Sequence, residues 1–249
     1  STMSLTEGST VTLSSGIQSQ NQNAQITVEG TSNLIQNNTN SSAYRGQINI
    51  QSNGLLTFKG QDLGVINSLN NAEINLSQNS GLGFEIENNI TLDAGDVMAN
   101  FDTITPSGTL NIYKTGDNEM TLAGDFDGIA DEYNISGGKL IASDENLASS
   151  DTVNVNNAEF EYSTKGEIVN NVSLSNGSTY TINANSGDEA ITINNSPVFN
   201  GANNTVNLEN GNYDLNTNFR SDEIQNININ SSDVSFRGGG ISQNTTVPI

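Results

Sequence analysis

Short apolar–polar–apolar triplets recur along most of the chain, and helical periodicity is almost absent. Because successive side chains of a strand point to opposite faces, triplets rich in Val, Ile, Thr, Tyr and Phe predict half-buried strands. From Tyr133 onward the triplets come in pairs that recur about every 15–21 residues, which is typical of stacked repeats. The first members of the pairs are 133–135, 153–155, 172–174, 191–193, 206–208 and 227–229, and the second members are 140–141, 160–162, 180–182, 198–199, 213–215 and 234–236.

Short turns of Asn, Gly and Ser separate the two members of a pair, as at 156–158, 175–177 and 209–211. Asn and Gly tolerate left-handed backbone conformations, so the chain can change direction there within one or two residues. The order of strand, sharp corner, strand and looser return predicts an all-β fold, a parallel β-helix (β-solenoid) with coils of about 20 residues. We expect it to be right-handed, because parallel crossovers nearly always are.

A two-sheet sandwich or a propeller is the alternative fold, since both also contain many short strands separated by turns. Both inner faces of a sandwich need apolar filling, however, and only 33% of this chain is hydrophobic. Asn side chains at matching positions of successive coils can instead form amide ladders along a solenoid. The composition therefore favours the solenoid.

The repeat predicts a single solenoid over residues 1–249, and two stretches interrupt its rhythm. Residues 14–46 are rich in Gln, Asn and Ser, and residues 93–108 contain Pro106 and a denser apolar mixture. Each is either a loop projecting from the coils or an irregular coil. Because no signal-peptide pattern opens the chain and it stops abruptly, we expect it to be a fragment of a longer polypeptide.

The segment 110–162 carries a more specific pattern. It contains Lys114-x-Gly116, Thr121-Leu122-x-Gly124 and Gly137-Gly138-x-Leu140, followed by a further pair of strands. This order resembles the passenger-associated transport repeat of bacterial autotransporters. The resemblance covers about fifty residues and implies a type V secretion passenger, displayed on or shed from the outer membrane of a Gram-negative bacterium, and hence extracellular. Two departures are that strands continue well past the repeat and that no membrane barrel follows.

The excess of acidic over basic residues argues against some classes of binding partner. The formal net charge is −21, from 28 acidic and 7 basic residues, and the basic residues form no cluster in the sequence. We therefore expect no binding to nucleic acid, which requires clustered Lys and Arg. No apolar run approaches the ~18 residues of a membrane span, so we expect no membrane insertion by this segment.

The residue types of this chain argue against an enzyme. The chain has no His and no Cys, so neither a Ser-His-Asp nor a Cys-His arrangement can form, and we expect a non-enzymatic protein without a cofactor. A glycan-degrading β-helix is the enzymatic alternative, and it would place two carboxylates beside an aromatic-lined groove. Tyr162, Tyr180 and Tyr213 are the aromatic candidates, but their regular spacing favours a place in the core.

The densest acidic cluster lies at 124–132. Asp125, Asp127 and Asp131 offer oxygen ligands of the kind that calcium prefers, and they are the candidate metal ligands of this chain. Their spacing fits neither an EF-hand nor the glycine-rich nonapeptide repeat, so a solvated acidic loop is the alternative.

Taken together, these features predict a bacterial adhesin or virulence-type passenger segment that mediates attachment or self-association. The expected partners are a host surface, a glycan or identical copies on neighbouring cells, since a polar repeat suits many individually weak contacts. The alternatives are a passive stalk or spacer, the glycan-degrading enzyme, and a phage tail fibre.

Overall fold

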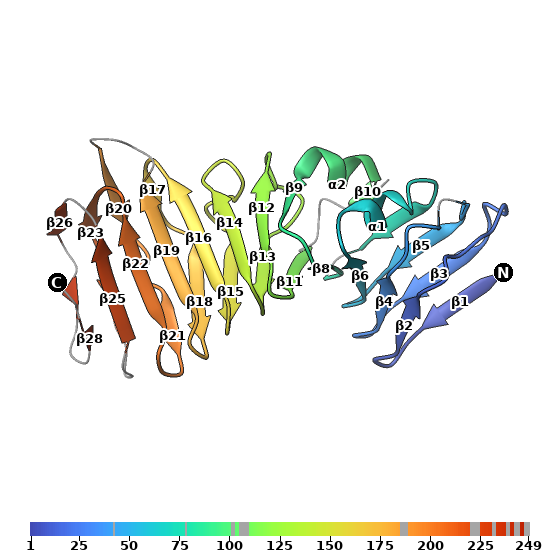
Figure 1. The fold of residues 1–249 in the computed structure, drawn as a ribbon, viewed down its shortest axis with the longest axis horizontal. Coiled ribbons are helices and arrows are strands. Elements are labelled where there is room, and N and C mark those ends of the chain that lie inside the picture. Colours follow the sequence, from blue (N-terminus) through green and yellow to red (C-terminus); the bar gives the residue numbers. More distant parts are fainter. Residues whose placement is uncertain are drawn as a thin grey trace. The chain divides into compact units, whose positions relative to one another are not determined.

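The computed structural model describes residues 1–41, 43–77, 79–100, 103–104, 110–184, 189–219, 225–230, 233–237, 240–241 and 245–246. It shows a parallel β-solenoid of about nine turns, with about 22 residues per turn (Figure 1), which confirms the predicted fold class. Backbone contacts group the chain into two compact units, which we describe separately: unit 1 comprises residues 1–120 and 128–132, and unit 2 comprises residues 121–127 and 133–249. The single solenoid domain over 1–249 stays a prediction.

Unit 1 contains two parallel sheets. The first sheet has the order β1 (Thr2–Leu5), β3 (Gln25–Val28), β5 (Gln47–Ile50), β7 (Glu73–Leu76) and β10 (Thr103–Ile104). The second has the order β2 (Thr10–Leu13), β4 (Asn33–Gln36), β6 (Leu55–Gly60), β8 (Gly81–Ile86) and β11 (Asn111–Thr115). The unit also contains α1 (Gly64–Asn67), β9 (Ile90–Asp93) and α2 (Ala94–Asn100), and β12 (Glu119–Ala123) crosses from unit 1 into unit 2.

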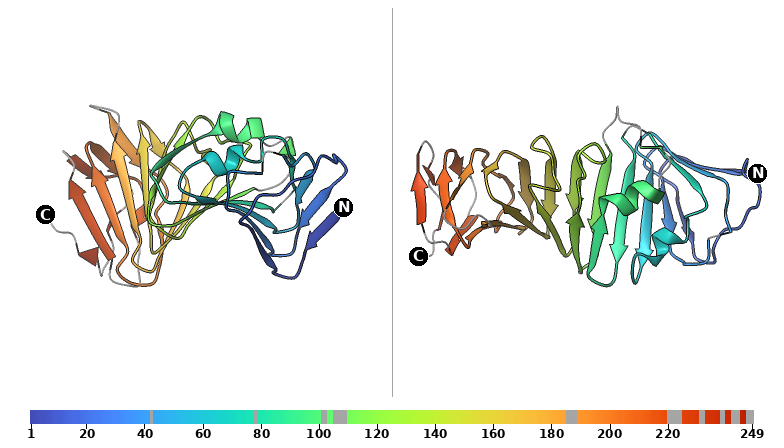
Figure 2. Two further views of the ribbon diagram at one scale, coloured as in Figure 1. Left: turned by 45° about the vertical axis from the view of Figure 1, so that its right-hand side comes forward. Right: turned by 90° about the horizontal axis from the view of Figure 1, so that it is seen from above.

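Unit 2 contains four parallel sheets (Figures 1 and 2). One has the order β13 (Glu132–Ile135), β15 (Thr152–Asn156), β18 (Asn171–Ser175) and β21 (Val198–Asn200). The next has the order β14 (Lys139–Ser143), β16 (Glu159–Thr164), β19 (Thr179–Ala184), β22 (Thr205–Glu209), β25 (Gln225–Asn230) and β28 (Thr245–Thr246). The third comprises β17 (Glu167–Ile168), β20 (Ala190–Ile193), β23 (Asn212–Leu215) and β26 (Asp233–Phe236), and the fourth comprises β24 (Asn218–Phe219) and β27 (Gly240–Ile241).

The corners between strands have the predicted chemistry. Asn157, Asn176 and Asn210 all adopt left-handed backbone conformations, with φ of 50°, 55° and 58°. Asn pays little for this conformation, and so the chain can turn sharply from one sheet to the next without a longer loop.

The core of each unit consists of the inward side chains of these strands. In β15, for example, Val153 and Val155 are buried while Thr152 and Asn154 are partly exposed. Equivalent inward residues stack from coil to coil, and the clearest case is Phe160 on Tyr180, whose ring centroids lie 5.3 Å apart with the planes inclined by 9°. Offset aromatic stacking of this kind adds to the burial of the two rings.

The assignment of triplets to two series is wrong beyond residue 190. Val198 and Phe199 pair with β18 of the first series, and Val206 pairs with Tyr180 of the second series. The reason is that a third strand enters each coil here, because β20 leaves the first series and joins β17 in a separate sheet. Paired residues then lie up to 26 positions apart, as Thr179 and Thr205 do, beyond the expected repeat.

The two irregular stretches contain regular elements where the structure describes them. Residues 14–46 contain β3 and β4. Residues 93–108 contain α2, which the sequence pattern did not predict and which lies beside the strands (Figure 2), while residues 101–102 and 105–108 fall outside the described part. The Asp93 carboxylate accepts a hydrogen bond from the Gly95 amide at 2.7 Å, a typical helix N-terminal interaction. Among residues 94–97 of this short helix, Ala94 and Val97, three positions apart, are buried.

Candidate functional site

The outer side of the β13–β15–β18–β21 sheet in unit 2 carries one charged side chain, Glu132 at the start of β13, and is otherwise uncharged. Alternation along the strands places one set of side chains in the core and the other set outside. We call the outward set other than Glu132 the neutral face, and it consists of Asn134, Thr152, Asn154, Asn156, Asn171, Ser173, Ser175, Val198 and Asn200. These nine residues are all uncharged, whereas the chain as a whole carries −21.

Hydrogen bonds between neighbouring coils hold the side chains of the neutral face in place. The Asn154 amide donates to Asn134 Oδ1 at 3.0 Å, and the Asn200 amide donates to Ser173 Oγ at 2.9 Å. The Ser175 hydroxyl donates to the Val155 carbonyl at 3.1 Å. Because these groups are already ordered, a partner that bound them would lose less side-chain entropy than on a mobile surface.

Val198 gives the neutral face an apolar contact point. Its exposed fraction is 58%, and it is the one large hydrophobic side chain that is exposed among the described residues. An isolated exposed Val is common on protein surfaces. On this face it stands among amides and hydroxyls, with Ser173 directly opposite it in the parallel pairing of β18 and β21.

Negative charge lies on the other two larger sheets of unit 2, where Glu159, Glu161 and Glu209 point outward from β16 and β22 and the third sheet carries three further acidic residues. Glu167, Asp214 and Asp233 point outward from β17, β23 and β26. Arg237 lies 3.3 Å from the Asp214 carboxylate, although its own side chain is largely exposed. The acidic residues of unit 2 are therefore unevenly distributed between its faces.

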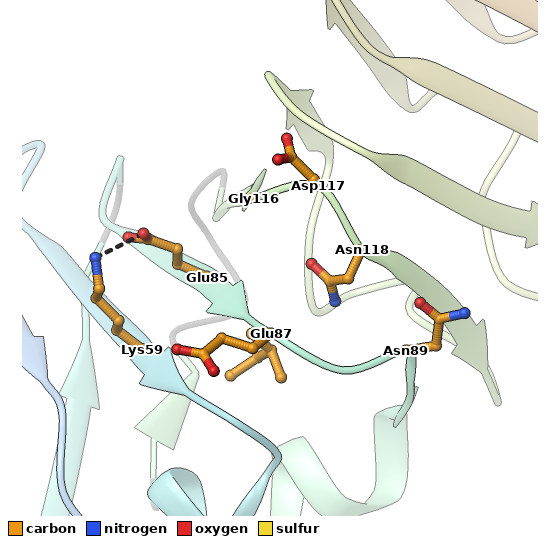
Figure 3. Close-up of a pocket in the computed structure, with 8 residues that line it drawn as sticks. Lys59, Glu85, Glu87, Asn89, Gly116, Asp117 and Asn118 are labelled. Carbon is orange, nitrogen blue, oxygen red and sulfur yellow. Dashed lines mark hydrogen bonds and ion pairs between the residues drawn. The ribbon is translucent and has the colours of Figure 1, made fainter.

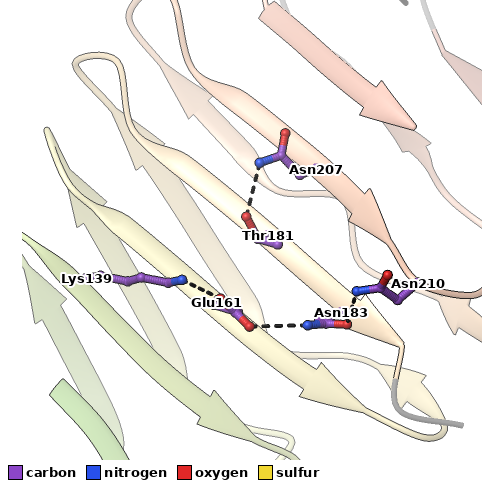
Figure 4. A network of polar contacts seen from close by, with 6 residues as sticks. All are labelled: Lys139, Glu161, Thr181, Asn183, Asn207 and Asn210. Atoms are coloured by element: carbon purple, nitrogen blue, oxygen red, sulfur yellow. Dashed lines mark hydrogen bonds and ion pairs between the residues drawn. The ribbon is translucent and has the colours of Figure 1, made fainter. Parts of the chain in front are cut away.

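A second polar array lies on the outer side of β14, β16, β19, β22 and β25 (Figure 4). The Lys139 ammonium contacts the Glu161 carboxylate, and the Asn183 amide donates to Glu161 at 3.3 Å. Burial acts to raise the pKa of Glu161, but the hydrogen bonds from Lys139 and Asn183 outweigh it and hold the pKa below its usual value. A parallel row follows Thr181, Asn207 and Asn228, each amide donating to the preceding coil at 2.9–3.1 Å.

The three candidate tyrosines are core residues, as their spacing favoured. Tyr162, Tyr180 and Tyr213 are each at most 3% exposed. Burial raises the pKa of all three hydroxyls, to about 12 for Tyr162 and Tyr213. Their rings consequently do not form the floor of an open groove.

The candidate calcium ligands Asp125, Asp127 and Asp131 are exposed. The Asp125 carboxylate accepts a hydrogen bond from the Asp127 amide at 2.8 Å, which stabilises the turn. Asp131 belongs to unit 1, whereas the other two belong to unit 2. Over the described ranges, no three acidic side chains gather in a way that could hold a metal ion. Calcium binding stays a prediction.

No family model, curated protein or solved structure matches this chain significantly. What the structure defines is thus the class, a parallel β-solenoid with ordered polar arrays on its surface. In the described part of the chain, no helix has the length and apolar character that a membrane crossing requires.

The sequence reasoning did not single out the residues of the neutral face. Their signal was nevertheless present, because the middle positions of the first-series triplets, such as Asn134, Asn154 and Ser173, are outward and uncharged. Recognising a shared face required knowing that Val198 continues the same sheet, and the pairing of β18 with β21 alone supplies that.

Proposed function

We propose that this chain is a non-enzymatic adhesive segment that associates with identical copies through the neutral face. The observation that supports this is that nine of the ten outward residues of this sheet are uncharged, with Glu132 at its edge the exception, in a chain with a net charge of −21. The resemblance of 110–162 to an autotransporter passenger repeat supports a place on the outside of a bacterial cell, where such contacts would join neighbouring cells.

The electrostatic argument is direct. Two copies of a strongly negative chain repel each other, and this repulsion decreases with the distance between the charges and with ionic strength. Contact through the neutral face brings amides, hydroxyls and Val198 together while the exposed Glu167 and Asp233 stay on another sheet. Each contact is weak, so appreciable cell-to-cell attachment needs many copies acting together.

The test is the concentration dependence of self-association of residues 1–249, followed by sedimentation velocity at low and high salt. We expect association that strengthens with salt, because screening weakens the overall repulsion. The variant Ser173→Glu/Val198→Glu places two charges on the neutral face and should weaken association about tenfold or more, since like charges would oppose each other across the contact.

The matched control is Thr192→Glu/Asn212→Glu. Both residues point outward from the third sheet, which already carries acidic side chains, so this variant has the same net charge as the first. It should associate as the unmodified chain does once salt screens the added charge. Equal association of both variants would exclude the neutral face, and a chain that stays monomeric at all salt concentrations would favour the passive spacer.

A further inference from the structure

A pocket of about 420 Å³ opens in unit 1 where β6, β8 and the loop after β11 end (Figure 3). Lys59 and Glu85 project from the ends of β6 and β8, and Asp117 and Asn118 come from the loop after β11. Its volume lies within the ~300–1,000 Å³ range of small-molecule sites. The remaining lining residues are Ile86, Glu87, Asn89 and Gly116.

The walls of the pocket are fixed by contacts between two coils. The Asn118 amide donates to the Asn88 carbonyl at 2.6 Å, and Asn89 Oδ1 accepts from the Glu119 amide at 3.0 Å. Beneath the loop lies Lys114, which is 2% exposed and donates to the carbonyls of Thr115 and Gly116 at 3.0 and 2.8 Å. The pocket is therefore formed before any ligand arrives, which lowers the cost of binding.

The pocket presents hydrogen-bond acceptors and donors together. The carboxylates of Glu87 and Asp117 are exposed and, within the described residues, accept no side-chain hydrogen bond. Lys59 contacts Glu85 at 2.6 Å, which leaves other ammonium hydrogens of Lys59 able to donate to a ligand. The side-chain Nδ2 of Asn89 donates no hydrogen bond within the part of the chain described, although its Oδ1 accepts one from the Glu119 backbone.

The presence of carboxylate acceptors beside ammonium and amide donors favours some classes of ligand over others. An anionic ligand would meet three carboxylates and a single ammonium group. A metal ion would leave the Lys59 and Asn89 donors unused, and the described acidic residues include no group of three that could hold one. The hydroxyls of a neutral sugar both donate and accept, so they can use the carboxylates and the amine at the same time.

We propose that the pocket lined by Lys59, Glu87, Asn89 and Asp117 binds a neutral saccharide unit. The proposal concerns a different site from the neutral face, and neither depends on the other. No aromatic ring lines this pocket to stack on a sugar, so binding relies on polar contacts and each site is weak. Display of many copies would compensate for the weakness of each.

The test is binding of residues 1–249 to a panel of neutral oligosaccharides, with sialylated and sulfated oligosaccharides, spermidine and calcium as comparators. Binding is followed by NMR titration, so that perturbed backbone amides identify the site. We expect neutral members to perturb residues 85–89 and 116–119. Preference for the anionic, cationic or metal comparators, perturbation elsewhere, or no binding at all would overturn the proposal.

Two variants sharpen the test. Glu87→Ala/Asp117→Ala removes both acceptors and should weaken binding about tenfold or more, whereas Glu87→Gln/Asp117→Asn keeps one acceptor oxygen in each side chain and should weaken it less. A cationic ligand would instead lose binding equally in both variants.

The control Glu145→Ala/Glu167→Ala removes two exposed carboxylates of unit 2 and should bind as the unmodified chain does. Far-UV circular dichroism checks that each variant is folded, and self-association through the neutral face should persist in all of them.

Discussion

Lys114 offers the sharpest test of the packing in unit 1. Its side chain points into the coil from β11, between the inward Ile112 and the turn at Gly116, and it is 2% exposed. Burial lowers the pKa of its ammonium group from 10.5 to about 8, although the Asp117 carboxylate acts to raise it. Replacing it by Met (Lys114→Met) keeps a side chain of similar length and removes the titrating charge.

The sign of the pH dependence follows from this pKa. Between pH 8 and 10.5 the unfolded chain holds a proton on Lys114 that the folded chain has released, so the free energy of unfolding rises with pH in this window. For the values of 8 and 10.5, the rise between pH 7 and 9.5 amounts to about 2 kcal/mol. Above pH 10 the buried tyrosines reverse the trend, because their raised pKa values stabilise the folded state only while the hydroxyls stay protonated.

The assay is urea unfolding followed by far-UV circular dichroism at pH 7 and pH 9.5. Subtracting the change in Lys114→Met from the change in the unmodified chain isolates the contribution of this residue. Lys165→Met removes an exposed lysine of unit 2 and serves as the control. If the unmodified chain and Lys114→Met show the same dependence on pH, Lys114 is hydrated and the buried position assigned to it is wrong.

Two further substitutions test the core of unit 2. Phe160→Ala removes the ring that stacks on Tyr180 in a fully buried position, and we expect the free energy of unfolding in urea to fall by about 3–5 kcal/mol, with Phe160→Leu costing clearly less. Tyr213→Phe deletes a hydroxyl that lies 2.8 Å from the Ile182 carbonyl and accepts from the Ala184 amide at 3.1 Å. Its loss should cost about 1–3 kcal/mol in the same assay, and an unchanged urea midpoint would show that water replaces it.

The sequence predicted the local parts of the fold because those parts depend on local chemistry. The strand triplets follow from alternation, and the corners at Asn157 and Asn176 follow from the tolerance of Asn for positive φ. The register beyond residue 190 does not follow, because 198–199 and 206–208 are similar apolar segments that fit either series. Only the length of the intervening turns decides which strand each one joins, and those turns carry no distinctive pattern.

The pocket was harder to predict for a similar reason. Lys59 and Glu85 are 26 positions apart and become neighbours only through the pairing of β6 with β8. The sequence reasoning grouped Lys114 with basic residues that form no cluster and assigned it no place in the core, yet its place two positions after Ile112 in a strand that alternates already indicated an inward side chain. A buried Lys contradicts the usual preference of this residue for water, and sequence reasoning follows that preference.

Net charge illustrates how much function depends on placement rather than composition. A net charge of −21 predicts that two copies repel each other at every face only if the charge is spread evenly over the surface. In unit 2 the parallel register separates two kinds of outward position, because uncharged residues succeed one another from Asn154 to Ser173 to Val198, while Glu167 and Asp214 lie on another sheet. If copies associate as proposed, this separation of charge would direct the contacts between them to the neutral face. Self-association through the neutral face should therefore stop at a complex of defined size and orientation. If the charge were instead spread evenly over the surface, salt would weaken the repulsion on every face and the copies would aggregate without limit.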